Sequence, residues 1–234
     1  MYYSSAQNYW KHSCARISEK EHHLLTQYAG SVDKNFWVLD IGDHPSSLTK
    51  SPFIPAHWIF MDLSHENLHK FDEKYARIQA DAQFLPFLGK KINCIFSRYV
   101  LEHLPDIDTF LRESRRVLKK NGTLVAVIPN LYYHLHWTGY MLPFSIQKRL
   151  WRALRGVDLN YPICYTANTQ SRWNTLAKEY NLEIVYFKYY NAPSAWLLKI
   201  PPLFWINELL HQILRIPFLK HFRSSILIAV RFRS

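Results

Sequence analysis

Two aspartates end short apolar segments at a spacing that suits nucleotide binding. Asp40 lies near the end of the segment that begins at Phe36, and Asp62 ends another such segment 22 residues further along the chain. In an open parallel sheet, ligands bind beyond the carboxyl ends of the strands, and a carboxylate about 20 residues after the first strand accepts hydrogen bonds from a ribose diol. The spacing therefore indicates a cofactor that contains adenosine. The simpler alternative is that both carboxylates cap turns.

The strands that must position these carboxylates are short and apolar throughout. Runs of this kind are typical of strands that are buried on both faces of a parallel sheet. The predicted strands cover residues 36–42, 57–62, 91–97 and 124–130. From Asp106 to Lys120, apolar residues instead recur at helical spacing. Strands and helices that alternate at this rhythm predict an α/β fold with a parallel sheet.

The C-terminal half has a different pattern. Residues 131–165 are aromatic and basic and have no clear period, and residues 193–222 form an apolar insert that prolines interrupt. We expect this insert to form one or two amphipathic helices. The other predicted elements are a helix from Ser18 to Tyr28, a helix that Ala167-Asn-Thr169 can cap and that reaches about Tyr180, and strands over 182–190 and 225–232.

Five segments within residues 36–130 form an ordered set. They are Val38–Gly42, Met61–Ser64, Ala80–Phe87, Ile95–Pro105 and Arg116–Gly122. In this order they resemble the successive motifs of class I S-adenosylmethionine-dependent methyltransferases, and the nearest match is the methyltransferase type 11 group. The resemblance implies a Rossmann-like methyltransferase fold, in which a mostly parallel sheet has helices on both faces and a C-terminal antiparallel hairpin. It also implies S-adenosylmethionine as the cofactor.

The resemblance assigns roles to residues at the strand ends. Asp40 and Gly42 would shape the loop beneath the methionine part of the cofactor, and Asp62 would bind the ribose hydroxyls. Ser97 and Arg98 would line the floor near the sulfonium through backbone contacts. The sulfonium is an activated methyl donor, so such an enzyme mainly aligns a nucleophile with it and excludes water.

Two further assignments concern the adenine and the first loop. Asp81 and Ala82 would meet the adenine edge. The family loop after the first strand usually carries repeated glycines, whereas here Gly42 precedes Asp43-His44-Pro45. Proline lacks an N–H and fixes φ, and the two side chains before it fill space that glycine leaves empty. This departure leaves open a methyltransferase-like binding protein that has lost the cofactor.

The sequence gives no firm catalytic base. His103 is a candidate, because an unperturbed histidine titrates at a pKa of about 6.5, but a structural histidine that fixes its loop is the favoured interpretation. His134 and His136 are weaker candidates on the loop after the fourth strand. His65 and His69 can share a helix face, but no third ligand has a suitable spacing, so no metal site is predicted.

The positive charge is concentrated in the second half of the chain. The formal net charge is +11, of which residues 1–120 contribute +2 and residues 121–234 contribute +9. Five of the eight tryptophans also lie in the second half. Basic segments that are rich in Trp and Leu fit the interface of an anionic membrane, and a substrate lid with solvated basic edges fits equally well. The abundance of apolar side chains argues against a nucleic-acid groove.

These observations predict an organisation and a function. The expected parts are an N-terminal helical segment, a cofactor-binding core, a substrate-side cap with a sixth strand, the apolar basic insert and a last strand, over residues 1–35, 36–130, 131–192, 193–222 and 223–234. We expect a cytoplasmic methyltransferase, peripheral to the inner membrane face, that acts on a small or lipid-linked acceptor. The absence of a signal-like segment and of a long apolar run supports this location. An RNA methyltransferase is a further alternative. The oligomeric state is not predicted.

Overall fold

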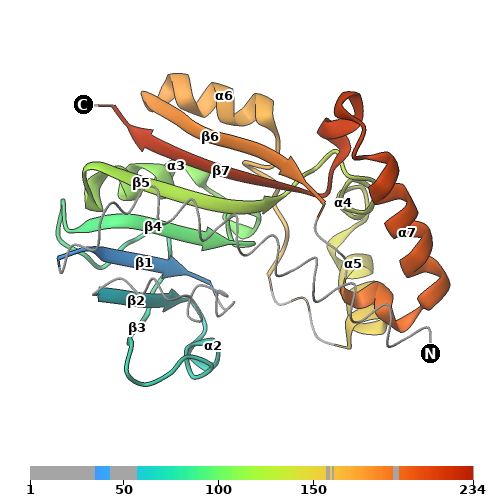
Figure 1. Cartoon of the computed structure of the whole chain (residues 1–234). Coiled ribbons are helices and arrows are strands. Elements are labelled where there is room, and N and C mark those ends of the chain that lie inside the picture. The colour runs from blue at the N-terminus through green and yellow to red at the C-terminus, as the bar shows by residue number, and fades with distance from the viewer. Residues whose placement is uncertain (1–34, 43–56, 157–158, 160, 192–194, 234) are drawn as a thin grey trace.

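One mixed sheet of seven strands organises the part of the chain that the structure describes. The structure is a computed structural model, and it describes residues 35–42, 57–156, 159, 161–191 and 195–233. The strand order is β3-β2-β1-β4-β5-β7-β6 (Figure 1). The strands are β1 (Trp37–Ile41), β2 (His57–Asp62), β3 (Ala76–Gln79), β4 (Ile92–Arg98), β5 (Leu118–Pro129), β6 (Leu182–Tyr190) and β7 (Ser225–Phe232). The first five run parallel, and β7 pairs antiparallel with both β5 and β6.

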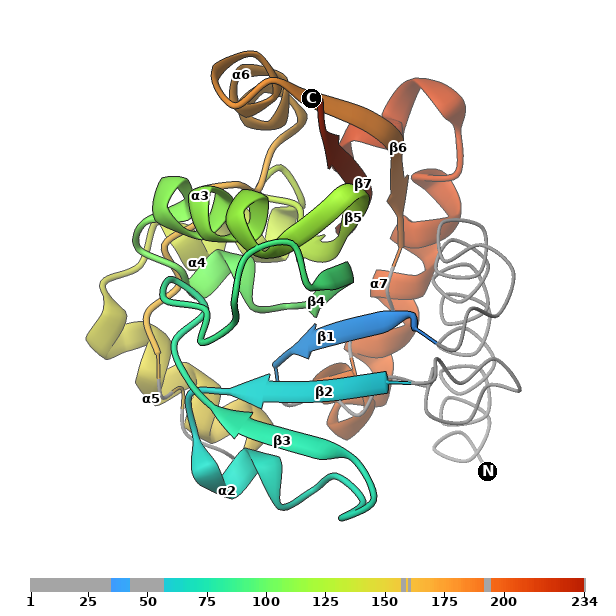
Figure 2. The ribbon, with the colours of Figure 1, turned by 90° about the vertical axis from the view of Figure 1, so that its left-hand side faces the viewer.

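Helices and 3-10 turns connect these strands. They are α2 (His65–Leu68), η2 (Leu101–His103), α3 (Ile107–Val117), α4 (His134–Tyr140), α5 (Phe144–Arg155), α6 (Gln170–Glu179), η3 (Ala195–Lys199), α7 (Pro201–Ile213) and η4 (Pro217–Phe222). Among the described residues, no helix combines the length and the apolar character needed to cross a membrane. The strands β1, β2 and β3 point toward the side where α4 and α5 lie (Figures 1 and 2).

The helix α3 forms where the sequence predicts one, and it ends earlier. Asp106 is its N-cap, because its side chain accepts a hydrogen bond of 3.0 Å from the amide of Thr109. The predicted helix extends to Lys120, but the structure ends it at Val117. The next residues already belong to β5, where Asn121 adopts a left-handed φ of 65° and the pairing with β4 shifts register.

The two faces of the sheet carry different cores. One face packs against α3 and α6 through buried side chains such as Phe110 and Trp173, and Figure 2 shows these helices on that side. On the other face, Phe60 stacks on Phe71 at 4.1 Å between ring centroids, and Leu68 of α2 joins the same cluster. Burial of each large apolar side chain contributes about 1.5–3 kcal/mol. The predicted α/β architecture is therefore confirmed.

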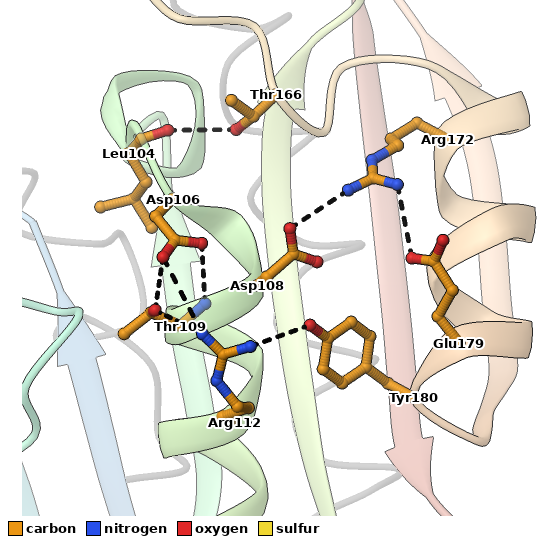
Figure 3. Close-up of polar contacts among 9 residues, drawn as sticks. All are labelled: Leu104, Asp106, Asp108, Thr109, Arg112, Thr166, Arg172, Glu179 and Tyr180. Carbon is orange, nitrogen blue, oxygen red and sulfur yellow. Dashed lines mark hydrogen bonds and ion pairs between the residues drawn. The ribbon is translucent and has the colours of Figure 1, made fainter.

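Polar contacts connect α3 to α6 at the surface (Figure 3). The guanidinium of Arg172 lies 3.5 Å from the carboxylate of Asp108 and 3.4 Å from that of Glu179. Arg112 donates a hydrogen bond of 3.4 Å to the hydroxyl of Tyr180. These groups are substantially exposed, so each pair contributes on the order of 0–1 kcal/mol.

Most predicted elements are confirmed, and one strand was missed. The strands β6 and β7 and the helix α6 agree with the prediction, and α6 is capped by Thr169. The insert forms the amphipathic helix α7 between two 3-10 segments. The sequence does not indicate β3, because Ala76–Gln79 is a half-exposed edge strand without an apolar run. The predicted helix from Ser18 to Tyr28 lies outside the described residues.

Candidate functional site

The end of β1 places a carboxylate and a glycine at the carboxyl edge of the sheet. Asp40 is buried, and its register partners are Phe60 of β2 and Phe96 of β4. Gly42 follows with a φ of +115°, and its amide donates a hydrogen bond of 2.9 Å to the carbonyl of Met61. This left-handed conformation favours glycine, so the chain can turn sharply beside the predicted cofactor.

The side of Gly42 that has no β-carbon faces the loop after β4. A β-carbon built on Gly42 would lie 2.5 Å from Cγ2 of Val100 and 3.7 Å from the carbonyl oxygen of Arg98. The ends of β1 and β4 therefore approach each other at van der Waals distance only because residue 42 is glycine. The residues Asp43-His44-Pro45, which depart from the family loop, lie outside the described residues.

Asp62 ends β2 and lies beside the backbone that leads to Asp81. One carboxylate oxygen of Asp62, Oδ1, accepts hydrogen bonds of 2.7 Å from the amide of Ser64 and 3.1 Å from the side chain of Asn67. The carbonyl of Asp62 accepts a bond of 3.1 Å from the amide of Ala80. The carboxylate is thereby held in one orientation at the strand end, which a ribose-binding group requires.

The loop after β3 brings Asp81 and Ala82 to the same edge. Asp81 accepts a hydrogen bond of 2.8 Å from the amide of Gln83, so its side chain closes a turn. Ala82 is buried in the core. Since Ala80 is bonded to the end of β2, both predicted adenine-side residues lie next to the predicted ribose-side residue Asp62.

The end of β4 supplies the remaining predicted residues. Ser97 is fully buried and pairs in register with Ile41 on one side and Ala126 on the other. Its hydroxyl has no hydrogen-bond partner within the part of the chain that the structure describes. Arg98, the last residue of β4, is half-buried. All seven predicted site residues therefore lie at or just after the ends of neighbouring strands.

Glu102, which no sequence motif indicated as a site residue, has an unusual environment. Its side chain is 4% exposed, and Oε2 has no hydrogen-bond partner among the described residues. Burial raises the pKa of Glu102 to about 8. A buried carboxyl group close to a binding edge is a recurring property of functional sites. The signal in the sequence was a glutamate in the turn directly after a buried strand.

His103 fastens the neighbouring loop. Its Nδ1 lies 2.9 Å from the carbonyl oxygen of Pro162, and burial lowers its pKa. The carbonyl of Glu102 accepts hydrogen bonds from the amides of Cys164 at 2.6 Å and Tyr165 at 3.2 Å. These contacts favour the structural interpretation of His103, which holds the 162–165 segment over the turn after β4.

The weaker base candidates His134 and His136 lie in the helix α4, and not in a loop as predicted. Nδ1 of His136 lies 3.0 Å from the carbonyl oxygen of Asn130, and burial is the main cause of the lowered pKa of His134. His65 and His69 meet edge to face at 4.5 Å between centroids. In the described ranges, no group of three His, Cys, Asp or Glu residues could hold a metal ion.

Part of the chain matches a known family of domains. Residues 39–126 match the family model of a methyltransferase domain, and this range contains all seven predicted site residues. The matching region extends from β1 through most of β5. The part of the chain from β1 to β5 is thus similar to a methyltransferase domain, and this match supports S-adenosylmethionine as the cofactor.

The chain is similar to parts of two curated proteins. It is 30% identical over 111 residues to a malonyl-[acyl-carrier protein] O-methyltransferase of Hamiltonella defensa, and the match covers 43% of this chain and 40% of that protein. It is 33% identical over 104 residues to a ubiquinone biosynthesis O-methyltransferase of Pelagibacter ubique, and the match covers 42% of this chain and 43% of that protein. The match thus spans about two fifths of the length of each relative.

Solved structures extend the similarity of fold over most of the chain. Geranyl diphosphate C-methyltransferase from Streptomyces coelicolor superposes with a TM-score of 0.57 at 12% identity, and the match covers 94% of this chain and 80% of that one. The YcgJ protein of Bacillus subtilis gives a TM-score of 0.56 at 19% identity, with 92% and 99% covered. These likenesses show the Rossmann-like methyltransferase fold.

Proposed function

We propose that this chain is an S-adenosylmethionine-dependent methyltransferase. The observation that carries this proposal is the gathering of Asp40, Gly42, Asp62 and Ser97 at one edge of the sheet, within the matched domain. The site fits the cofactor in two respects. Gly42 turns the chain sharply at the end of β1 with a φ of +115°, and the buried hydroxyl of Ser97 has no partner in the described part of the chain.

The residues of the chain would bind and orient, and the bound cofactor would supply a methyl group activated by its sulfonium. The carboxylate of Asp62 would accept hydrogen bonds from the ribose hydroxyls, and Asp81 with Ala82 would meet the adenine edge. The backbone at Ser97 and Arg98 would line the floor beneath the reacting centre. The methyl group would pass directly to the acceptor with inversion, and exclusion of water would protect this step.

The acceptor that we propose is small or lipid-linked. The similar proteins are named for malonyl-[acyl-carrier protein], ubiquinone biosynthesis and geranyl diphosphate. In this chain, the segments beyond the carboxyl edge expose large apolar side chains, among them Trp137, Met141 and Leu150. An apolar acceptor fits such surroundings better than a nucleic acid does.

The same features support a location. The half of the chain with a formal charge of +9 also holds these apolar side chains, so we propose a cytoplasmic protein in peripheral contact with the inner membrane face. The non-catalytic alternative rests on Asp43-His44-Pro45, because these residues replace the usual glycines of the loop.

Calorimetry with S-adenosylmethionine tests the proposal. We expect a dissociation constant in the micromolar range for the full chain, about the range of KM values for enzyme substrates. Binding of S-adenosylmethionine weaker than millimolar would contradict an enzymatic function and favour the non-catalytic alternative. If binding is observed, transfer of a labelled methyl group to a lipid extract, to small polar metabolites or to RNA identifies the class of acceptor.

A further inference from the structure

The helix α7 is oriented with its polar side inward. Asn207, Glu208 and His211 are buried, at 4–5% exposed. By contrast, Ile206 and Leu209 are each 63% exposed. A helix that covers a protein core normally shows the opposite arrangement, with its apolar stripe buried and its polar side in water.

A buried polar network fixes this orientation. The hydroxyl of Tyr133 donates a hydrogen bond of 2.5 Å to Oδ1 of Asn207 and lies 3.0 Å from Nε2 of His211. Nδ1 of His211 lies 3.2 Å from Oε1 of Glu208. The carbonyl of His211 accepts a bond of 2.9 Å from the side chain of Asn191. Rotation of α7 would break these bonds inside the protein, and each buried polar group that loses its partner costs about 1–3 kcal/mol.

The outward side of α7 continues into the next segment and forms one apolar stretch. We call this stretch the α7 surface. Its members are large apolar side chains exposed by at least 45%: Leu203, Ile206, Leu209, Ile213, Ile216, Phe218 and Phe222. Phe218, just after α7, is 85% exposed. Within α7, the spacing of three or four residues places the four leucine and isoleucine side chains along one stripe.

The charges beside the α7 surface are positive. Lys199, Arg215 and Lys220 are exposed. Glu208 is the only acidic residue between positions 195 and 233, and it lies on the buried side of α7. An occupant of the α7 surface must therefore offer apolar material in the middle and negative charge at the border. A second copy of the same surface would offer cations instead.

We propose that the α7 surface lies in the interfacial layer of a membrane that carries anionic lipid. Its side chains would enter the boundary between headgroups and acyl chains, and the flanking Lys and Arg would meet lipid phosphates. Since Tyr133, just after β5, bonds to Asn207 of α7, docking brings the carboxyl end of β5 near the lipid. The docking itself does not depend on the proposed function. Its consequence does, because only a methyltransferase would receive a lipid-linked acceptor from the membrane.

Flotation of the full chain with liposomes tests the proposal. The vesicles are phosphatidylcholine alone, or phosphatidylcholine with a quarter phosphatidylglycerol, at low and high salt. We expect binding to the anionic vesicles that weakens with salt. The variant Ile206→Glu should lower the bound fraction about tenfold or more, because it adds a negative charge and removes an apolar contact. Leu88→Glu is the matched control, since Leu88 is 75% exposed and lies outside the α7 surface.

Three outcomes would overturn the proposal. They are no binding to anionic vesicles, equal loss in both variants, and a dimer in sedimentation that Ile206→Glu dissociates, because that result would assign the α7 surface to a second copy. Circular dichroism shows whether the variants fold. Calorimetry with S-adenosylmethionine on the same samples keeps the two hypotheses apart, since lost cofactor binding concerns the proposed function and lost flotation concerns the α7 surface.

Discussion

Gly42 and Val100 lie so close that a β-carbon on the glycine would be 2.5 Å from Cγ2 of the valine. This contact joins the turn after β1 to the turn after β4 at the edge where we place the cofactor. It also explains why residue 42 is glycine although the next residues in the sequence are bulky. A side chain at position 42 would need both a left-handed φ and a displaced Val100.

We therefore expect Gly42→Ala to weaken S-adenosylmethionine binding by at least about tenfold and to lower the free energy of unfolding by about 1–3 kcal/mol. Calorimetry and urea unfolding measure the two effects. Gly139→Ala in α4 is the control, because no atom lies within 4 Å of its added β-carbon. That variant should bind as the wild type does. Unchanged binding by Gly42→Ala would contradict the role of this turn.

Asp62→Asn tests the ribose contact. The amide oxygen can still accept the bond from Ser64, so the strand end should keep its shape while the carboxylate charge is lost. We expect affinity for S-adenosylhomocysteine to fall about 10–100-fold, in line with hydrogen bonds to a charged group. Replacement of the ribose by 2′-deoxyribose should weaken binding less in the variant than in the wild type. The half-exposed Asp72, changed to Asn, is the control. If Asp62→Asn lowers the affinity for S-adenosylhomocysteine and for its 2′-deoxyribose analogue by the same factor, Asp62 does not contact the ribose.

Glu102→Gln should remove a pH dependence of stability. The pKa of Glu102 is raised by burial to about 8 in the folded protein, against 4.5 for an ordinary glutamate. The folded state therefore holds more protons than the unfolded state between these values, and the free energy of unfolding falls as pH rises from about 5 to 8. At pH 8 the variant should be more stable than the wild type by about 2–4 kcal/mol, and at pH 4.5 the two should agree.

Urea unfolding at several pH values measures this difference. Glu73→Gln, at an exposed position, controls for the removal of a carboxylate. If the wild type and Glu102→Gln show the same slope against pH, then Glu102 is not a buried neutral acid in the folded protein.

His103→Gln separates a positioning residue from a general base. The ring contacts the carbonyl of Pro162, and burial lowers its pKa, so we expect it to be neutral at pH 7 and to act by holding the 162–165 segment. The variant should lose about 1–2 kcal/mol of stability, with an unchanged pH profile of methyl transfer. The exposed His69, changed to Gln, is the control. A loss of 100-fold or more in kcat together with an altered pH profile would instead identify a base.

The sequence predicted the interior of the fold better than its edges. Strands such as β2 and β7 are apolar because they are buried on both faces, so their residues alone identify them. The edge strand β3 was missed, since it packs on few neighbours and needs no apolar run. The end of α3 was misplaced because Val117 and Leu118 both continue the apolar pattern, and only pairing with β4 decides that Leu118 is in a strand.

In the candidate site, too, some features could be predicted from the sequence and others could not. Motif order indicated Asp40, Asp62 and Ser97, because each is the last or the next-to-last residue of a strand that the sequence makes recognisable. The burial of Glu102 and the inward polar side of α7 depend on what packs over them. The contact between Tyr133 and His211 joins residues 78 positions apart, so no local pattern could indicate it.

The position of β7 has a consequence for the order of assembly. It follows β6 in the chain, yet it lies between β5 and β6 and bonds to both. While the protein is made, β6 leaves the ribosome with no strand to join, and the edge of β5 stays exposed until residues 225–232 emerge. A nascent chain that stalls before this point would carry two unprotected strand edges, which makes it a substrate for chaperones and for aggregation.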